Sequence, residues 1–375
     1  MKRALLVGYF GKGNVGDDAF LAVNALYAQK LLGIDRALVT GPAPLQTYAV
    51  PNVPLHLWRN FTQFGLARLN TRIKARGVDY VIFGGGSIFR TQEAIKRCEG
   101  YLDLAGAGPH FAVGVSIGPF RDAGAGAACR HFLRRLAFVG VRDRESLVRV
   151  QEIAPEANAH LTFDLGPLFA AHFRPDIAEP PAASRLGISL CSFQHSGDGR
   201  ERERMLVDKV SAALRNGPLV RRLDEVILLD CNSNPANGDH AVHEELIRRL
   251  DRRIRVRHVP YENDPRAFLS EMQGLRALLA MRLHAGVFGY CLERPTVILG
   301  YQEKSFEWAK MIGQPSSLVL DALSLSADGI SGAIECALES SCPKARLPVS
   351  EAVFASRLNW AWLDSSPRMG CMIQE

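Results

Sequence analysis

Short apolar runs alternate with longer amphipathic stretches along most of the chain. This pattern is typical of parallel sheets flanked by helices, and it predicts an α/β fold. In the first half, the run from 3 to 9 has the length and apolar content of a buried strand, and 17–32 has the apolar spacing of a helix. Further strands are predicted at 36–40, 79–83, 111–117, 137–141 and 160–163.

The alternation stops at 174–184, where RPDIAEPPAAS contains three prolines and few apolar residues. Such composition is typical of a linker between domains. The pattern then restarts with predicted strands at 186–191, 225–231, 254–259, 275–281 and 296–300, and with helices at 200–215, 239–253 and 284–292. We therefore predict two Rossmann-like domains, 1–175 and 184–325, with a ligand cleft between them, and a helical tail over 326–375 containing helices at 327–338 and 350–363.

Composition narrows the class of protein. The 375 residues are enough for two domains, and 47% apolar with 22% charged residues is ordinary globular composition. Eight cysteines without a C-x-x-C pair indicate reduced thiols in a cytoplasmic protein rather than a disulfide framework or a zinc site. The first apolar run breaks at Gly8, too early for a signal peptide. The net charge of +6 includes no dense basic run, which argues against nucleic acid and leaves peripheral association with an anionic membrane open.

Gly11-Lys12-Gly13-Asn14-Val15-Gly16 matches the G-x-G-x-x-G pattern of dinucleotide-binding turns. However, the following helix opens with Asp17 and Asp18, whose carboxylates satisfy the helix dipole and would repel a pyrophosphate. Two interpretations remain. The turn and its aspartates are purely structural, or Asn14 and Asp17 hydrogen-bond sugar hydroxyls, with Asp17 as a base that removes a hydroxyl proton.

Three cationic positions and a histidine follow predicted strands. Arg282 and His284 lie between an apolar strand and a helix, where free amides and the helix dipole favour an anion. Arg142 follows the strand at 137–141, and Lys304 follows the strand at 296–300. Because ligands of α/β sheets bind outside the carboxyl ends of the strands, these positions are on the side of each sheet where a ligand would bind, and Arg282 with His284 could meet an anion there. The plain alternative is that His284 is an ordinary N-cap-region histidine, Arg282 a surface charge and Lys304 a solvated lysine.

Gly84-Gly85-Gly86-Ser87 follows the strand at 79–83 in the same way. The glycines would allow a close backbone approach at the cleft. Alternatively, the amides of Gly85 and Gly86 and the side chain of Ser87 would contact substrate.

Five segments, in order, resemble the polysaccharide pyruvyl transferase family: GYFGKGNVGDDA (8–19), DYVIFGGGSIF (79–89), SIGPF (116–120), VRDRES (141–146) and MRLHAGVFGYCLERPTVILGYQEK (281–304). The resemblance implies two Rossmann-like domains of the glycosyltransferase-B type. It also implies transfer of the pyruvyl group of phosphoenolpyruvate onto two hydroxyls of a saccharide or lipid-linked oligosaccharide, giving a cyclic ketal and phosphate. Neither metal nor cofactor is expected.

The site roles follow from position and resemblance together. His284 is the expected proton donor, with Arg282 and Asp17 as further catalytic residues, while Arg142, Lys304, Asn14, Gly85, Gly86 and Ser87 are expected to bind substrate. The first domain would hold the acceptor and the second phosphoenolpyruvate, in the cytoplasm or at the inner face of the membrane. Three alternatives are a glycosyltransferase that uses a nucleotide sugar, a non-catalytic glycan-binding or assembly protein, and, least favoured, a dehydrogenase.

Overall fold

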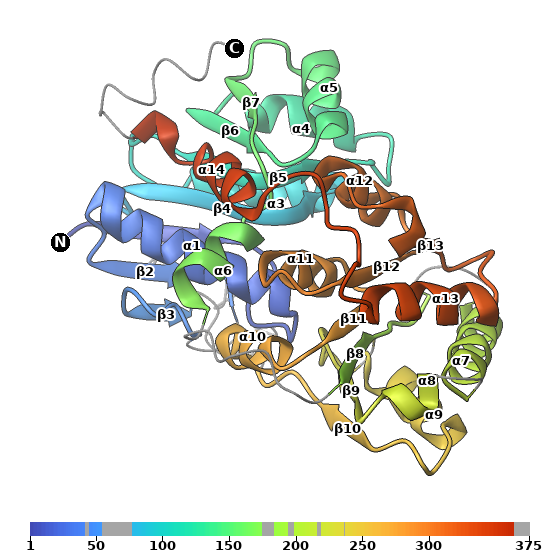
Figure 1. Ribbon diagram of the computed structural model, residues 1–375. Coiled ribbons are helices and arrows are strands. Elements are labelled where there is room, and N and C mark those ends of the chain that lie inside the picture. Colours follow the sequence, from blue (N-terminus) through green and yellow to red (C-terminus); the bar gives the residue numbers. More distant parts are fainter. Residues whose placement is uncertain are drawn as a thin grey trace. The chain divides into compact units, whose positions relative to one another are not determined.

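A computed structural model describes residues 1–41, 45–54, 77–174, 184–193, 199–215, 219–235 and 237–363 (Figure 1). The chain divides into two compact units. The first comprises Met1–Lys12, Asp17–Phe169 and Val353–Glu375, and the second comprises Gly13–Gly16 and Ala170–Ala352. Each unit contains one parallel sheet.

The described part of the first unit has a seven-stranded sheet in the order β3-β2-β1-β4-β5-β6-β7. Every neighbouring pair is parallel, as for Leu5 opposite Leu38 on one side and Val81 on the other. The strands β2 and β3 lie on one side of β1, and the strands from β4 onward lie on the other side, so the strand order reverses between β1 and β4. Rossmann-type sheets bind ligands at such a switch point. The strands are β1 (Arg3–Val7), β2 (Arg36–Val39), β3 (Asn52–Pro54), β4 (Tyr80–Phe89), β5 (Phe111–Ile117), β6 (Phe138–Val141) and β7 (Ala159–Leu161).

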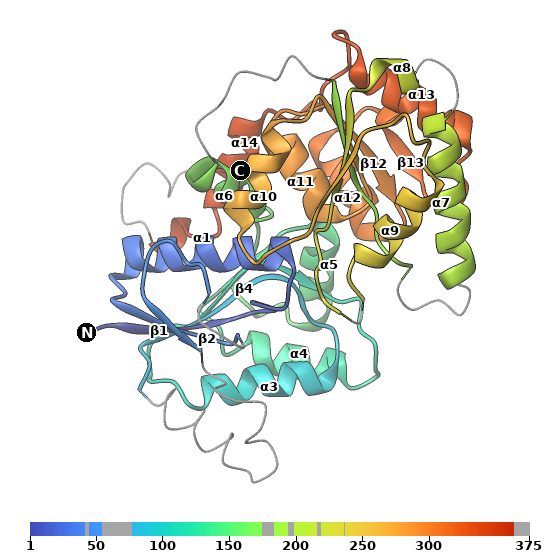
Figure 2. The same cartoon turned by 90° about the horizontal axis from the view of Figure 1, so that it is seen from below.

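Helices cover both faces of this sheet. Figure 2 shows α1 (Val15–Leu32) on one face and α3 (Gln92–Leu102) with α4 (Ala125–Leu133) on the other. Cys98 of α3 and Phe132 of α4 are buried against strand residues such as Phe83. The remaining helices that contribute to this unit are α5 (Arg144–Ile153), part of α6 (Gly166–Phe173), part of α14 (Val349–Arg357) and the 3-10 turn η3 (Ala361–Leu363).

The described part of the second unit has a six-stranded parallel sheet in the order β10-β9-β8-β11-β12-β13. Here the chain reverses its direction of growth between β8 and β11. This is the strand order of a dinucleotide-type Rossmann domain, so the same rule places a ligand at the carboxyl ends of β8 and β11. The strands are β8 (Arg185–Ser189), β9 (Glu225–Leu229), β10 (Val256–Val259), β11 (Ala277–Ala280), β12 (Thr296–Gly300) and β13 (Val319–Asp321).

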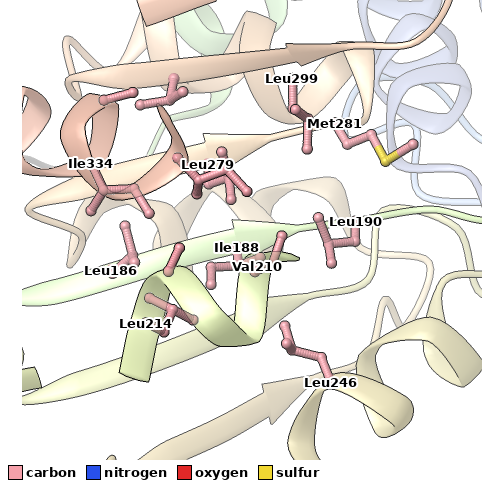
Figure 3. Close-up of a cluster of buried hydrophobic side chains, with 14 of the residues drawn as sticks. Leu186, Ile188, Leu190, Val210, Leu214, Leu246, Leu279, Met281, Leu299 and Ile334 are labelled. Carbon is pink, nitrogen blue, oxygen red and sulfur yellow. The ribbon is translucent and has the colours of Figure 1, made fainter. Parts of the chain in front are cut away.

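The core of the second unit lies between its sheet and three helices (Figure 3). Val210 and Leu214 of α7 (Gly199–Arg215), Leu246 of α9 (His240–Arg249) and Ile334 of α13 (Ala327–Leu338) pack on strand residues such as Leu279. Apolar burial of this extent stabilises the unit without disulfides. The other elements are α8 (Leu219–Arg222), α10 (Pro265–Gln273), α11 (Leu283–Cys291), α12 (Glu303–Ile312) and η2 (Ser316–Leu318).

The predicted fold class is confirmed: two parallel α/β units and a helical C-terminal segment. Several details differ from the sequence prediction. β4 continues through Gly84-Gly85-Gly86-Ser87, where the sequence predicts that the strand has ended, and the short strands β3 and β13 were not predicted. The C-terminal segment 326–375 is divided, with α13 in the second unit and residues from Val353 in the first. Most of the predicted linker, 175–183, lies outside the described residues.

The sequence also predicts that the cysteines are reduced thiols. The cysteines in the described ranges are free thiols, and burial raises the pKa of Cys98 and of Cys129 to about 12. Thiols with such pKa values are unreactive at neutral pH. Among the described residues, no helix combines the length and the apolar character needed to cross a membrane.

Candidate functional site

Arg282 lies at the carboxyl end of β11 and is the N-cap residue of α11. Its guanidinium donates to Oδ1 of Asp239 from Nε at 2.9 Å and from Nη2 at 2.5 Å. The side chain of Arg282 is 13% exposed and that of Asp239 is completely buried. Burial alone would lower the pKa of Arg282, but the neighbouring Cys191 and Asp239 raise it above its ordinary value. The cation is therefore permanent and held in one orientation.

The second oxygen of Asp239 organises a loop. Oδ2 accepts from the backbone amides of Cys231 and Asn232 at 2.9 and 3.0 Å. This loop in turn binds the glycine turn of the N-terminal segment: Val15 N donates to Cys231 O, and Ser233 N donates to Gly13 O. Gly13–Gly16 therefore belongs structurally to the second unit.

His284 is in the first turn of α11, two residues after Arg282. Its ring packs against Gly16, where a Cβ atom would lie only 1.9 Å from Nδ1. Gly16 is thus required by close contact with the imidazole. The last glycine of the G-x-G-x-x-G turn therefore makes room for the His284 ring, which is a different role from pyrophosphate binding.

Asn14 and Lys304 complete the predicted residues of the second unit. Asn14 Oδ1 accepts from Gly16 N at 3.1 Å, and Asn14 forms a bridge with Asn232, so this side chain shapes the turn. Lys304 is the second residue of α12 and is exposed. Burial raises the pKa of the Cys191 thiol, while Arg282 and Lys304 act in the opposite direction, which places both cations near this thiol.

Arg142 follows β6 in the first unit. Its Nε donates to Ser116 Oγ at 2.7 Å and its Nη1 donates to Asp164 Oδ2 at 2.8 Å. Both charged side chains are more than nine-tenths buried. Arg142 therefore has a buried structural partner, Asp164, which the sequence did not reveal.

Asp17 lies beside the triple glycine of β4 in the first unit. A Cβ atom at Gly86 would be 3.3 Å from Asp17 Oδ1, and one at Gly85 would be 2.1 Å from Phe20 of α1. Both glycines have positive φ, 74° for Gly85 and 77° for Gly86. Their absence of side chains thus lets α1 pack on β4. Ser87, the next residue, is half-buried.

A third group, which the sequence did not reveal, contains the only described cluster with metal-ligating potential: Asp230, His243 and His258, with candidate ligand atoms within 4.8 Å of one another. The contacts are direct hydrogen bonds to Asp230 Oδ1, at 2.5 Å from His243 Nδ1 and 2.8 Å from His258 Nε2. Leu190 N donates to His243 Nε2, which leaves the ring proton on Nδ1. A metal ion at Nδ1 would therefore require an imidazolate, so we interpret this cluster as a hydrogen-bond network.

The predicted residues thus form two groups. Asn14, Arg282, His284 and Lys304 belong to the second unit, and Asp17, Gly85, Gly86, Ser87 and Arg142 belong to the first. Sequence reasoning missed Asp239 as the partner of Arg282. In the sequence, Asp239 stands at the start of a predicted helix, and this position is typical of an ordinary helix cap. The position therefore gave no indication of its contact with Arg282.

Two Rossmann-type sheets with a helical C-terminal segment define a glycosyltransferase-B fold, and solved structures agree. The chain superposes on UDP-bound MnaA of S. aureus with a TM-score of 0.62 at 11% identity, over 98% of each chain. HepE of Anabaena in complex with UDP and glucose gives 0.55 at 10% identity over 96% of each chain. Sucrose-phosphate synthase of Thermosynechococcus elongatus gives 0.54 at 12% identity over 99% of this chain and 98% of the other. At these identities the likeness concerns the fold alone.

The family model described as polysaccharide pyruvyl transferase matches residues 14–303. The chain belongs to this family, as the five sequence segments predicted. No curated protein matches the sequence at a significant level.

Proposed function

We propose that the protein transfers the pyruvyl group of phosphoenolpyruvate onto two hydroxyls of a saccharide. The observation that carries this proposal is the arrangement of Arg282, His284 and Lys304 at the carboxyl edge of the second sheet, beside the point where its strand order reverses. A buried, oriented guanidinium beside an imidazole suits a donor that carries a phosphate and a carboxylate. Membership in the family supports the same reaction.

The reaction requires a proton donor. His284 protonates the methylene carbon of phosphoenolpyruvate, which makes C2 electrophilic, and the first sugar hydroxyl attacks C2 and loses its proton. Phosphate then leaves as the C2–O bond breaks, and the second hydroxyl closes the ketal. The proton of the attacking hydroxyl passes by way of Asp17 to phosphate, and the proton of the second hydroxyl restores His284, whose own proton is now part of the new methyl group. A dianion close to His284 favours the protonated imidazole, as this role requires.

The first unit would contribute the acceptor side. Asp17 is the proposed base for the attacking hydroxyl, and Ser87 with the amides of Gly85 and Gly86 would contact the saccharide. Arg142 would contact substrate through Nη2, since Nε and Nη1 are bonded to Ser116 and Asp164. Asn14 and Lys304 would complete the binding groups.

We further propose that the acceptor belongs to a cell-surface polysaccharide or its lipid-linked precursor. The reaction would then take place in the cytoplasm or at the inner face of the membrane. It needs no cofactor besides phosphoenolpyruvate as donor substrate.

The test is purified protein with phosphoenolpyruvate and host glycan, followed by phosphate release and by NMR for a new ketal carbon. We expect both signals, and their loss in His284→Gln. A His284→Gln variant that turns over normally would remove His284 from the mechanism, and the absence of a ketal carbon with every host glycan fraction would contradict the reaction.

A nucleotide-sugar glycosyltransferase is the second candidate, favoured by solved relatives in fold whose structures contain UDP. In this case Arg282 and Lys304 would hold a diphosphate. Thermal unfolding separates the two, because a ligand that binds the native state raises Tm. We expect phosphoenolpyruvate, and not UDP- or GDP-sugars, to raise it. A protein that responds to neither donor but retards polysaccharide on a gel would be a glycan-binding protein.

A further inference from the structure

A ring of contacts in the second unit joins Arg282 and His284 through Asp239, a residue outside both the glycine turn at 11–16 and the segment at 281–304. The ring runs from Asp239 to Arg282, along the chain to His284, and across the close contact to Gly16. From Gly16 it returns through Val15, whose amide donates to Cys231 O at 3.0 Å. The Cys231–Asn232 peptide closes the ring because the Asn232 amide donates to Asp239 Oδ2 at 3.0 Å.

The two carboxylate oxygens of Asp239 bind different parts of this ring. Oδ1 accepts two N–H groups of Arg282, and Oδ2 accepts the amides of Cys231 and Asn232. The Cys231–Asn232 peptide group connects Oδ2 to the glycine turn, since its N–H points to Asp239 and its C=O accepts from Val15. Hydrogen bonds in such a chain polarise one another, so the loss of one weakens the next.

Asp239 is fully buried, and its position is fixed by further bonds. Its own backbone amide donates to Asn232 O at 2.8 Å, and it is the N-cap residue of α9 although its side chain caps no helix amide. A side chain placed as a cap that instead contacts Arg282, 43 positions away in sequence, is specialised for that contact.

We propose that Asp239 is a positioning residue, which orients the guanidinium of Arg282 and, through the Cys231–Asn232 peptide, holds Gly16 against His284. The inference rests on the proposed function for the roles of Arg282 and His284. The proposal adds to that function the residue that fixes Arg282, the anion-binding cation, and His284, the proton donor, relative to each other.

The first test is hydrogen exchange in the full chain, which requires no activity. Asp239→Asn keeps the shape and one acceptor oxygen but removes the charge, and we expect faster exchange in peptides covering 13–16 and 231–234, with unchanged exchange in β4 and β5. The matched control is Glu245→Gln on the same helix, whose carboxylate binds the exposed side chain of Arg248 and the half-buried Arg249. Unchanged exchange of 13–16 in a folded Asp239→Asn variant would overturn the proposal.

The second test is kinetic. A misplaced catalytic group costs rate more than binding, so we expect Asp239→Asn to lower kcat about tenfold or more while the KM for phosphoenolpyruvate changes less than about threefold. Arg282→Gln should mainly raise KM. The double variant should combine the raised KM of Arg282→Gln with the lowered kcat of Asp239→Asn, because Asp239 also acts on Gly16 and His284 through the Cys231–Asn232 peptide. A double variant with the kcat of Arg282→Gln would contradict this second branch.

The two tests separate the two proposals. If phosphoenolpyruvate is no substrate, the kinetic arm gives no signal, yet altered exchange at 13–16 still supports the positioning role. If the transferase is active while exchange and kcat of Asp239→Asn match the wild type, the positioning role fails and the proposed function stands.

Discussion

The side-chain oxygen of Asn359 accepts a hydrogen bond from the backbone amide of Gly114 at 2.7 Å, across 245 positions of the sequence. Asn359 also donates to Phe163 O at 3.0 Å and accepts from Thr162 Oγ1 at 2.8 Å. One amide side chain near the C-terminal end of the described chain thus satisfies groups of β5 and of the segment after β7.

Replacement of Asn359 by Leu should therefore destabilise the first unit. The similar-sized apolar side chain leaves the buried Gly114 N–H and Phe163 C=O without their partner, at a cost of about 1–3 kcal/mol for each group. Urea unfolding monitored by circular dichroism measures the loss, and Glu351→Gln, an exposed change on α14, is the control. Equal midpoints for the two variants would show that the C-terminal segment does not support the sheet.

Arg142 combines a proposed substrate contact with a structural ion pair, and a paired substitution separates the two. Arg142→Gln alone leaves the buried Asp164 carboxylate uncompensated, with an expected loss of about 3–5 kcal/mol in unfolding free energy. Arg142→Gln with Asp164→Asn should recover most of this stability. If Arg142 also contacts substrate, the stable double variant should still show a raised KM for phosphoenolpyruvate; a wild-type KM would limit Arg142 to its structural role.

Gly16→Ala should impair activity by steric conflict with His284. The new Cβ would lie 1.9 Å from Nδ1, so the imidazole has to move, and we expect kcat to fall about tenfold or more. Gly100→Ala, on α3, is the matched control because its Cβ would meet no atom within 4 Å. That variant should gain about 0.5–1 kcal/mol in stability, as alanine replaces glycine within a helix. Full activity in Gly16→Ala would show that the position of the His284 imidazole is not critical for catalysis.

The hydrogen-bond network around Asp230 should make the free energy of unfolding depend on pH in the acid range. Burial alone would raise the pKa of Asp230, but hydrogen bonds from His243 and His258 lower it to about 2. A carboxyl group whose pKa is depressed in the folded state stabilises the fold above its unfolded pKa of about 3.9, and this contribution is lost as the pH falls toward 2.

Asp230→Asn should therefore be less stable than the wild type at pH 6 and should lose less stability between about pH 4 and pH 2. Thermal unfolding across this range measures both effects. Asp328→Asn, an exposed carboxylate of α13, should leave the wild-type profile unchanged. Parallel profiles for Asp230→Asn and the wild type would exclude this network as the source of acid sensitivity.

Local patterns were sufficient for the fold and for part of the site. The run Phe111–Ile117 was predicted with its observed bounds because Ser116 is its only polar residue, and all seven residues are buried in the structure. The strand-to-helix junction at Arg282 and His284 could be predicted because periodicity alone locates it. The end of β4 was mispredicted, since glycines normally interrupt strands, whereas here close packing of α1 retains them within the strand.

The partners of the charged residues could not be predicted. Asp239 contacts Arg282 across 43 positions, and Asp164 contacts Arg142 across 22. Such pairs depend on which strands become neighbours, and hydrophobic spacing does not encode strand order. The Asp230 network could not be predicted for the same reason, because its three residues come from the segment after β9, from α9 and from β10.

If the first unit binds the acceptor as proposed, the triple glycine of β4 limits how the choice of saccharide can be changed. Asn24, Phe20 and Asp17 already occupy the space that side chains at Gly84, Gly85 and Gly86 would enter. A side chain at Gly84 or Gly85 would collide with Asn24 or Phe20 of α1, and one at Gly86 would press on Asp17 in a backbone conformation that favours glycine. A library designed to alter acceptor choice at this edge of the sheet should therefore keep the glycines and vary Ser87, the first residue after them with a side chain of its own.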